Sequence, residues 1–188
     1  MQVSAVILSA APVSREIPGV KVAPFVSTFR DAAGLLASRF EAIRRVETEW
    51  FFMLDDTDEL PVDYPQVLDA CMSAGTPLAY TDEQITAADG TSFIRKSGPY
   101  SEDRFIADFT LIHHLAVCRT DAALRAIQAV PQGLYAFENL LYFQVAKEGA
   151  TYIEGIGYVW HRRGGLSRDP SLLIGQVQSA TWAHRNKS

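Results

Sequence analysis

The sequence predicts a mixed α/β fold organised as a single domain over residues 1–188. The first observation is that apolar segments of strand length alternate with segments of helical period, as expected for strands joined by helices. The second is the length of the chain, because 188 residues are enough for one substantial core. The third is that no internal repeat, low-complexity tract or linker divides the chain.

Composition and charge exclude several classes of protein. Hydrophobic residues make up 48% of the chain and charged residues 21%, which is ordinary for a globular protein and unlike disordered or membrane chains. The net charge of −5 argues against nonspecific binding to nucleic acid. The N-terminal segment has no basic region of a signal peptide and is too short to span a bilayer. We expect Cys71 and Cys118 to be free and buried, and the protein to be cytoplasmic.

In the first half of the chain, short apolar strands alternate with helices. The segment 3–10 is continuously apolar, and a loop with two prolines and a glycine follows it. The first helix has an apolar stripe that includes Leu36, Phe40 and Ile43. The expected elements are strands at 3–10, 21–27, 50–54 and 77–81 and helices at 31–46 and 64–73.

In the second half, residues 87–104 are rich in Gly, Ser, Asp and Lys, which predicts a loop or a hairpin turning at 88–90. The apolar segment 105–119 predicts a strand. On a strand the adjacent His113 and His114 would point to opposite faces, so at most one of them could line a cleft. The remaining expected elements are a helix at 121–130, an amphipathic helix at 137–148 ended by Gly149, a strand at 151–160 and a helix that begins near residue 170.

The segment 50–54 runs directly into four acids, Asp55, Asp56, Asp58 and Glu59. Acids just past the carboxyl end of a buried strand lie where open α/β sheets bind ligands. Two unit charges about 4 Å apart repel by roughly 4 kcal/mol at an effective dielectric constant near 20. A hard divalent cation, Mg²⁺ or Mn²⁺, would relieve that repulsion. A solvated acidic turn is the alternative interpretation of this motif.

Further segments accompany the acidic motif in a recognisable order. They are Ala37-Ser38-Arg39 before the motif, then 78–83, Phe137-Glu138-Asn139 and 158–167 after it. This order resembles the GT-A fold of family-2 glycosyltransferases, the inverting enzymes that use nucleotide sugars. The resemblance covers residues 35–168 and implies a single-domain, GT-A-like mixed sheet flanked by helices.

The resemblance also implies a metal site on the diphosphate of the donor. Asp56 and Asp58 would hold the metal, and His161 would complete its coordination. Asp55 would be either a neighbouring acid or the first ligand itself. A gapless match to the family pattern Leu-Asp-x-Asp-Asp-Glu-Leu puts Thr57 at the second metal aspartate. Either the motif is shifted by one residue, which we expect, or the metal coordination is weakened.

By the same resemblance, Glu138 would be the general base that takes the proton of the acceptor hydroxyl. The family often has Glu-Asp there, whereas this chain has Glu138 followed by Asn139, which cannot accept that proton. Arg39, Arg162 and Arg163 would bind the diphosphate, since guanidinium groups match phosphate geometry. The alternatives are a helix-start charge for Glu138 and exposed basic side chains for the arginines.

The implied activity is metal-dependent, inverting transfer of a sugar from a nucleotide sugar to an acceptor hydroxyl. Mn²⁺ or Mg²⁺ would be the cofactor and a UDP-sugar the donor, although no aspartate precedes Asp31 to read the nucleobase. Asp82 and Glu83 would border the acceptor, which could be a saccharide, a lipid carrier, a protein or a modified nucleobase. The oligomeric state stays open. Two alternatives are a degenerate GT-A domain that binds glycan or protein without catalysis, and a Mg²⁺-dependent nucleotidyltransferase.

Overall fold

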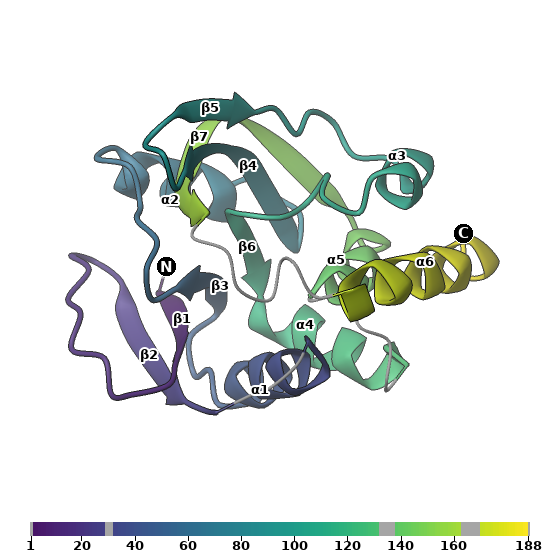
Figure 1. The fold of residues 1–188 in the computed structure, drawn as a ribbon, viewed down its shortest axis with the longest axis horizontal. Helices are drawn as coiled ribbons and strands as arrows, with labels where there is room; N and C mark the ends of the chain where they lie inside the picture. The colour runs from purple at the N-terminus through teal and green to yellow at the C-terminus, as the bar shows by residue number, and fades with distance from the viewer. Residues whose placement is uncertain (1, 29–31, 132–137, 163–169, 188) are drawn as a thin grey trace.

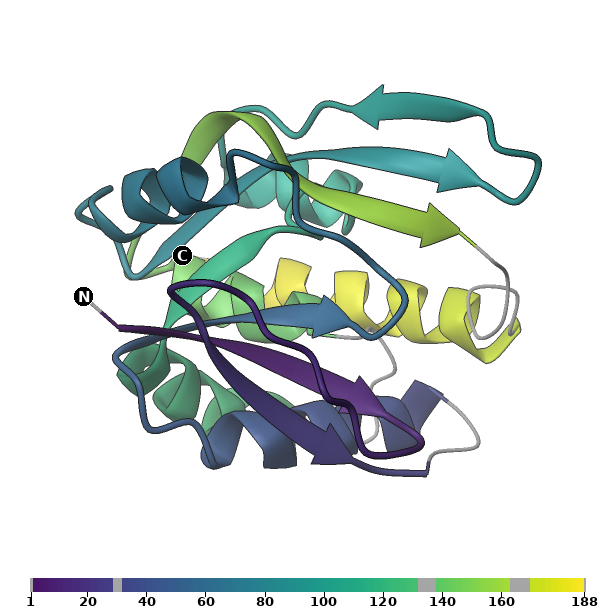
Figure 2. The same cartoon turned by 90° about the vertical axis from the view of Figure 1, so that its left-hand side faces the viewer.

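The computed structural model describes residues 2–28, 32–131, 138–162 and 170–187, which build one seven-stranded sheet with helices on both faces (Figures 1 and 2). The strands are β1 (Val3–Ser9), β2 (Lys21–Val26), β3 (Trp50–Asp55), β4 (Leu78–Ala87), β5 (Ser92–Arg95), β6 (Ala116–Arg119) and β7 (Ala150–Arg162). The helices are α1 (Ala32–Arg44), α2 (Tyr64–Met72), α3 (Glu102–Ala107), α4 (Thr120–Ala129), α5 (Asn139–Ala146) and α6 (Pro170–Arg185). The predicted α/β class with a mixed sheet is confirmed.

Strand direction decides where the ends of the strands meet. The order is β2-β1-β3-β6-β4-β5, and β7 pairs with β4 along its length. β1, β2 and β3 are parallel, β6 is antiparallel to both β3 and β4, and β7 is parallel to β4. The carboxyl ends of β1, β3, β4 and β7 therefore lie at the same edge of the sheet, called the carboxyl edge below. This is the edge that the acidic motif was expected to occupy.

Helices cover both faces of the sheet, so most residues of the central strands are buried. All seven residues of β1 are buried. Along β3 successive side chains alternate between two core clusters, with Met53 in one and Phe52 in the other. The Met53 cluster includes residues of α1, α3, α4, α5 and α6, whereas the Phe52 cluster includes residues of α2. Continuous apolar strands are the expected consequence of two covered faces.

Several sequence expectations are confirmed. The strands at 3–10, 21–27 and 50–54 and the helices at 64–73 and 121–130 form, as does the helix at 31–46 over its described part. The hairpin turning at 88–90 joins β4 to β5, and Gly90 has the positive φ of 84° that such a turn requires. β4 continues to Ala87, well beyond the predicted end, because its pairing with β7 resumes after register shifts next to Asp82. Cys71 and Cys118 are free and buried.

The strand predicted at 105–119 is wrong, because α3 occupies its first part and β6 begins only at Ala116. The hydroxyl of Ser101 accepts a hydrogen bond from the backbone N–H of Arg104 and so caps α3. The apolar residues that suggested a strand, Phe105 and Phe109, pack into the core from a helix and the turn after it.

The helix predicted at 137–148 begins at Asn139 in the described part, and the prediction that it is amphipathic is wrong. Seven of its eight residues are buried, since it packs against α4, α6 and β4. Residue 137 lies outside the described residues. Within the described part of the chain, no helix combines the length and the apolar character needed to cross a bilayer.

Candidate active site

The acidic motif forms a tight turn at the carboxyl edge, directly after β3. The backbone N–H of Asp58 donates to the carbonyl oxygen of Asp55 at 3.1 Å. Asp56 is exposed at the tip of this turn, whereas Asp58 folds back and is buried. Glu59 then exchanges two backbone hydrogen bonds with Val159 of β7, at 3.1 and 2.9 Å. The turn is therefore attached to β7 as well as to β3.

Asp58 and His161 lie together although 103 residues separate them. The backbone N–H of His161 donates to Oδ1 of Asp58 at 2.9 Å, and the hydroxyl of Tyr158 donates to Oδ2 at 2.9 Å. The same hydroxyl accepts a hydrogen bond from the backbone N–H of Asp55 at 3.0 Å. Burial raises the pKa of the Asp58 carboxyl above its usual value, and the His161 N–H opposes this shift only in part.

Arg39 connects the acidic turn to the start of α5. Its guanidinium lies 2.7 Å from Oδ1 of Asp55 and also forms an ion pair with Glu138. Arg39 and Glu138 are both buried, at 4% and 3% exposure. Burial disfavours the charged guanidinium, but Glu138 and Asp55 outweigh it and hold the pKa of Arg39 above its usual value. Burial likewise acts against the Asp55 carboxylate, and Arg39 overcomes it, so the pKa of Asp55 is lowered.

The structure thus brings five of the predicted site residues to one edge: Asp55, Asp58, Glu138, Arg39 and His161. Asp56 shares the turn with Asp55 and Asp58, but its side chain faces solvent. Arg162 is exposed at the end of β7, with its guanidinium 5.9 Å from the centre of the Trp160 ring. Arg163 lies outside the described residues.

A second cluster lies beside this edge, and sequence reasoning missed it. The Nδ1 atoms of His113 and His114 both lie 3.1 Å from Oε2 of Glu83, a residue of β4. The expectation that the two histidines point to opposite faces is wrong, because they precede β6 and are not part of a strand. The one available signal was that β4 runs into two consecutive acids, Asp82 and Glu83.

The surroundings of the two histidines shift their pKa values in opposite directions. Burial lowers the pKa of His113 to about 4, with the neighbouring His114 acting in the same direction. Burial acts on His114 too, but its hydrogen bond to Glu83 outweighs it and the pKa is raised. The Glu83 carboxylate is buried, yet both imidazoles hold its pKa well below the usual range.

Aromatic rings join the two clusters. The ring of His114 stacks on that of Tyr158 with centroids 4.4 Å apart and an interplanar angle of 15°. Tyr158 in turn carries the hydroxyl that binds Asp58. Trp160 meets His113 edge-on at 5.3 Å. Glu83 and its histidines are therefore neighbours of the aspartate turn, with one tyrosine between them.

Asp82, which was expected to border an acceptor, is fully buried and occupied by protein groups. The hydroxyl of Tyr152 and the backbone N–H of Ser97 donate to Oδ1 at 2.8 and 2.9 Å. Lys96 lies 2.9 Å from Oδ2. These contacts give Asp82 a role in fixing β4 against β7 and the segment after β5.

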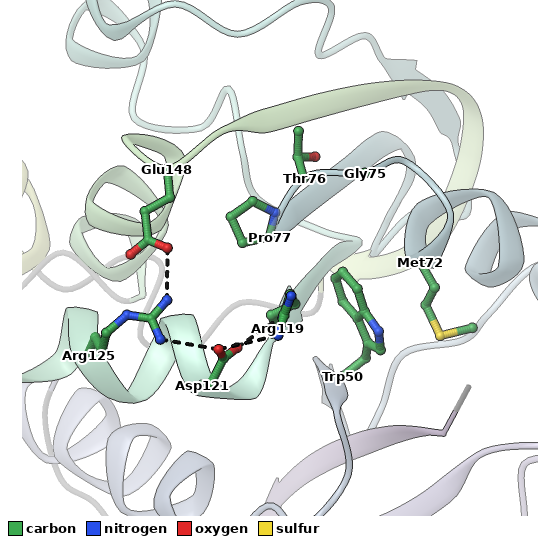
Figure 3. Close-up of a pocket in the computed structure, with 9 residues that line it drawn as sticks. All are labelled: Trp50, Met72, Gly75, Thr76, Pro77, Arg119, Asp121, Arg125 and Glu148. Atoms are coloured by element: carbon green, nitrogen blue, oxygen red, sulfur yellow. Dashed lines mark hydrogen bonds and ion pairs between the residues drawn. The ribbon is translucent and has the colours of Figure 1, made fainter.

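A cavity of about 240 Å³ lies at the opposite edge of the sheet (Figure 3). Trp50, the first residue of β3, lines it together with Met72 and Pro77. Its charged rim consists of exposed ion pairs, in which Arg125 contacts Asp121 at 3.2 Å and Glu148 at 2.8 Å. No predicted site residue lines this cavity, so the candidate active site is the carboxyl edge.

The topology, together with the acids at the carboxyl edge, defines a GT-A-like fold. The same fold occurs in TarS of S. aureus, a family-2-like glycosyltransferase of GT-A type. TarS 1–349 superposes with a TM-score of 0.58 at 11% identity, over 100% of this chain and 74% of that one. Its complex with UDP-GlcNAc superposes with a TM-score of 0.59 at 12% identity, over 89% of this chain and 61% of that one.

The likeness is therefore one of fold, and this chain spans 37% of the longer TarS chain. No protein-family model matches the sequence. No curated protein matches it either.

Proposed function

We propose that this chain is a glycosyltransferase that uses a nucleotide sugar, with its active site at the carboxyl edge. The observation that carries the proposal is the meeting of Asp58 and His161 across 103 residues, beside Asp55 and Glu138. The GT-A-like fold supports it, because TarS was solved with UDP-GlcNAc and with UDP. We therefore propose a UDP-sugar as the donor.

The residues of the acidic turn fit a hard divalent cation. Asp56 is exposed, and the side chain of Asp55 is 39% exposed, so both offer carboxylate oxygens, the ligands that Mg²⁺ and Mn²⁺ prefer. Each Asp58 oxygen accepts one hydrogen bond and keeps a further lone pair. Within the described residues, Nε2 of His161 forms no hydrogen bond, and it lies 3.3 Å from Oε1 of Glu59, an exposed carboxylate that a metal could replace as its partner. We propose these four residues as holders of the metal, which would neutralise charge on the diphosphate of the donor.

Glu138 is the proposed acceptor of the proton from the sugar acceptor. The hydroxyl would attack the anomeric carbon while its proton passes to the carboxylate, and the nucleoside diphosphate would leave from the opposite face with inversion. Arg39 acts as a positioning residue, since it binds Glu138 and Asp55 at once and fixes the spacing between base and acidic turn. Arg162 and Arg163 follow Trp160 and His161 in the chain and are proposed to bind the departing diphosphate.

The first experiment is a thermal melt of the full chain with Mn²⁺ and UDP, GDP, CDP or TDP. A ligand at about 100 times its Kd adds roughly 2.7 kcal/mol to stability, so UDP with Mn²⁺ should raise the Tm clearly above that with Mn²⁺ alone. Asp56→Asn should abolish this shift. Asp63→Asn is the matched control, because Asp63 is another exposed aspartate a few residues further along the chain. The proposal fails if no nucleoside diphosphate shifts the Tm beyond the metal alone.

A second candidate is a domain that binds a sugar nucleotide or glycan without catalysis. It is favoured by the state of Glu138, which is buried and already paired with Arg39. The next residue, Asn139, is also occupied, since its amide donates to the carbonyl oxygens of Phe109 and Ile112. Product analysis with UDP-sugars and, separately, with nucleoside triphosphates distinguishes the alternatives. Release of UDP indicates sugar transfer, release of pyrophosphate from a nucleoside triphosphate indicates nucleotidyl transfer, and binding with neither product indicates the non-catalytic domain.

A further inference from the structure

We propose that Glu83, His113 and His114 form a binding site for a first-row transition metal ion of the Zn²⁺ type. One potential ligand atom from each residue lies within 4.8 Å of those of the other two. None of the three belongs to the acidic turn, so the site is separate from the proposed Mg²⁺ or Mn²⁺ site and goes beyond the proposed function.

The spacing of the ligand atoms fits a metal. Metal–nitrogen and metal–oxygen bonds of about 2.0–2.2 Å place neighbouring ligand atoms roughly 2.8–3.6 Å apart in octahedral or tetrahedral sites. Oε2 of Glu83 lies 3.1 Å from Nδ1 of His113 and 3.1 Å from Nδ1 of His114. Three ligand atoms have three distances between them, and two of these distances already have the length that a bound metal requires.

The neighbours of the Glu83 carboxylate leave one of its two oxygens able to bind a metal. Glu83 is 1% exposed, and a buried carboxylate requires compensation by cations or hydrogen bonds. Arg95 lies 3.0 Å from its other oxygen, Oε1, and occupies that side. Oε2 is left facing the two imidazoles, so Glu83 would bind a metal through a single oxygen. In metal sites, neighbouring groups around a ligating carboxylate commonly fix its orientation, and the Arg95 ion pair could do so here.

The donor set indicates which metal. Two imidazole nitrogens and one carboxylate form the His₂Glu set of zinc sites that keep a further position open for water or substrate. Mg²⁺ and Ca²⁺ prefer all-oxygen sites, so this cluster discriminates against them. Because His114 stacks on Tyr158, which binds Asp58, a metal here would lie beside the proposed donor site.

The test is a titration of the full chain with Co²⁺, a spectroscopic substitute for Zn²⁺, in excess Mg²⁺ and without nucleotide. Excess Mg²⁺ competes with Co²⁺ at the carboxylate-rich acidic turn, whose proposed ligands are three carboxylates and one imidazole, and competes poorly at a site with two imidazoles. We expect one Co²⁺ per chain with a visible absorption band, and Zn²⁺ should displace it. His113→Asn, His114→Asn and Glu83→Gln should each weaken binding at least about 10-fold, because each removes a ligand.

Two controls separate this site from other metal-binding groups. His184→Asn removes an exposed histidine of α6 and should leave Co²⁺ affinity unchanged. Asp56→Asn should also leave it unchanged while abolishing the effect of UDP with Mn²⁺. The proposal is overturned if Co²⁺ does not bind with a visible band, or if binding survives both His113→Asn and His114→Asn.

If these variants fail to fold, an NMR measurement on the unmodified chain with Co²⁺ tests the proposed metal site. Imidazole N–H protons next to Co²⁺ give strongly shifted NMR signals that exchange with solvent. Two such signals are expected, one from each histidine, and their absence would contradict the site. Because this readout involves no nucleotide, it does not depend on whether the chain transfers sugar.

Discussion

Arginine side chains form ion pairs with carboxylates at both edges of the sheet, but the pairs differ in burial. At the carboxyl edge Arg39 is buried with Glu138, its partner 99 residues away in the sequence. At the opposite edge, the side chain of Arg125 is 55% exposed and contacts Asp121 within one helical turn (Figure 3). Buried charges are costly to desolvate and weak evidence for stability, whereas exposed pairs cost little. The buried ion pair, with its high desolvation cost, lies at the edge where we propose the active site. The exposed ion pair lies at the opposite edge.

The largest effect should come from breaking the buried pairs. Arg39→Met would leave Asp55 and Glu138 without their shared cation and should destabilise the chain by about 3–5 kcal/mol. Arg125→Met at the exposed edge should cost about 1 kcal/mol or less. Urea denaturation of both variants measures the difference. Equal losses would remove the contrast between the two edges.

Asp82 extends the comparison to pH. Burial opposes ionisation of Asp82, but Lys96, Ser97 and Tyr152 outweigh it and hold its pKa below 3.8. A carboxyl whose folded pKa is lowered adds stability above its unfolded pKa, and this stability is lost as the pH falls through the folded value. Asp82→Asn should therefore cost roughly 1.5–3 kcal/mol at pH 7 and progressively less below about pH 4, as expected for hydrogen bonds to a charged group.

Asp121 is the control for this measurement, because its pKa is also lowered but its side chain is 52% exposed. Asp121→Asn should change stability by about 1 kcal/mol at most at either pH. Denaturation midpoints at pH 7 and pH 3 give both comparisons. A loss for Asp82→Asn that is the same at both pH values would show that the charge of Asp82 is unimportant.

Tyr158 tests an uncharged hydrogen-bond donor at the carboxyl edge. Tyr158→Phe removes the hydroxyl shared by Asp58 and the Asp55 backbone, and should cost roughly 1–2 kcal/mol. Tyr64→Phe removes an exposed hydrogen bond to the Pro18 carbonyl and should cost under about 0.5 kcal/mol. The two thermal midpoints check this. If Tyr158→Phe also leaves the Tm unchanged, Asp58 does not depend on that hydroxyl.

Asp56→Asn should have the smallest effect on stability and a large effect on the binding of UDP with Mn²⁺. Asp56 is exposed, so Asp56→Asn should change the unfolding free energy by less than about 0.5 kcal/mol. The same substitution should weaken binding of UDP with Mn²⁺, measured by calorimetry. A variant that binds UDP with Mn²⁺ as the unmodified chain does would exclude Asp56 from the metal site.

Local patterns in the sequence predicted much of the fold. Buried strands such as 50–54 show as continuous apolar runs, and the acids that follow mark the end of a strand. The helix α5, with seven of its eight residues buried, has no apolar stripe, so its environment could not be predicted from periodicity. The segment with Phe105 was misassigned because a short apolar run does not distinguish a strand from a buried helical turn.

The site was predictable only where a motif carries it. The aspartate turn follows a strand and could be located, and its closeness to His161 was implied by the resemblance. The contacts of Glu83 with His113 and His114 span 30 and 31 residues of the sequence. They depend on the conformation of the segment before β6, whose sequence shows neither helical nor strand periodicity. The pairing of Arg39 with Glu138 spans 99 residues and is likewise a product of tertiary packing.

The two-way backbone bridge between Glu59 and Val159 has a mechanical consequence. It ties the turn that carries the aspartates to the strand that carries His161, so neither can shift without displacing the other. If the chain binds nucleotide sugars as proposed, donors of different size would be accommodated mainly by rotation of the exposed Asp56 and Arg162 side chains, because these two hydrogen bonds join the backbone segments that carry them.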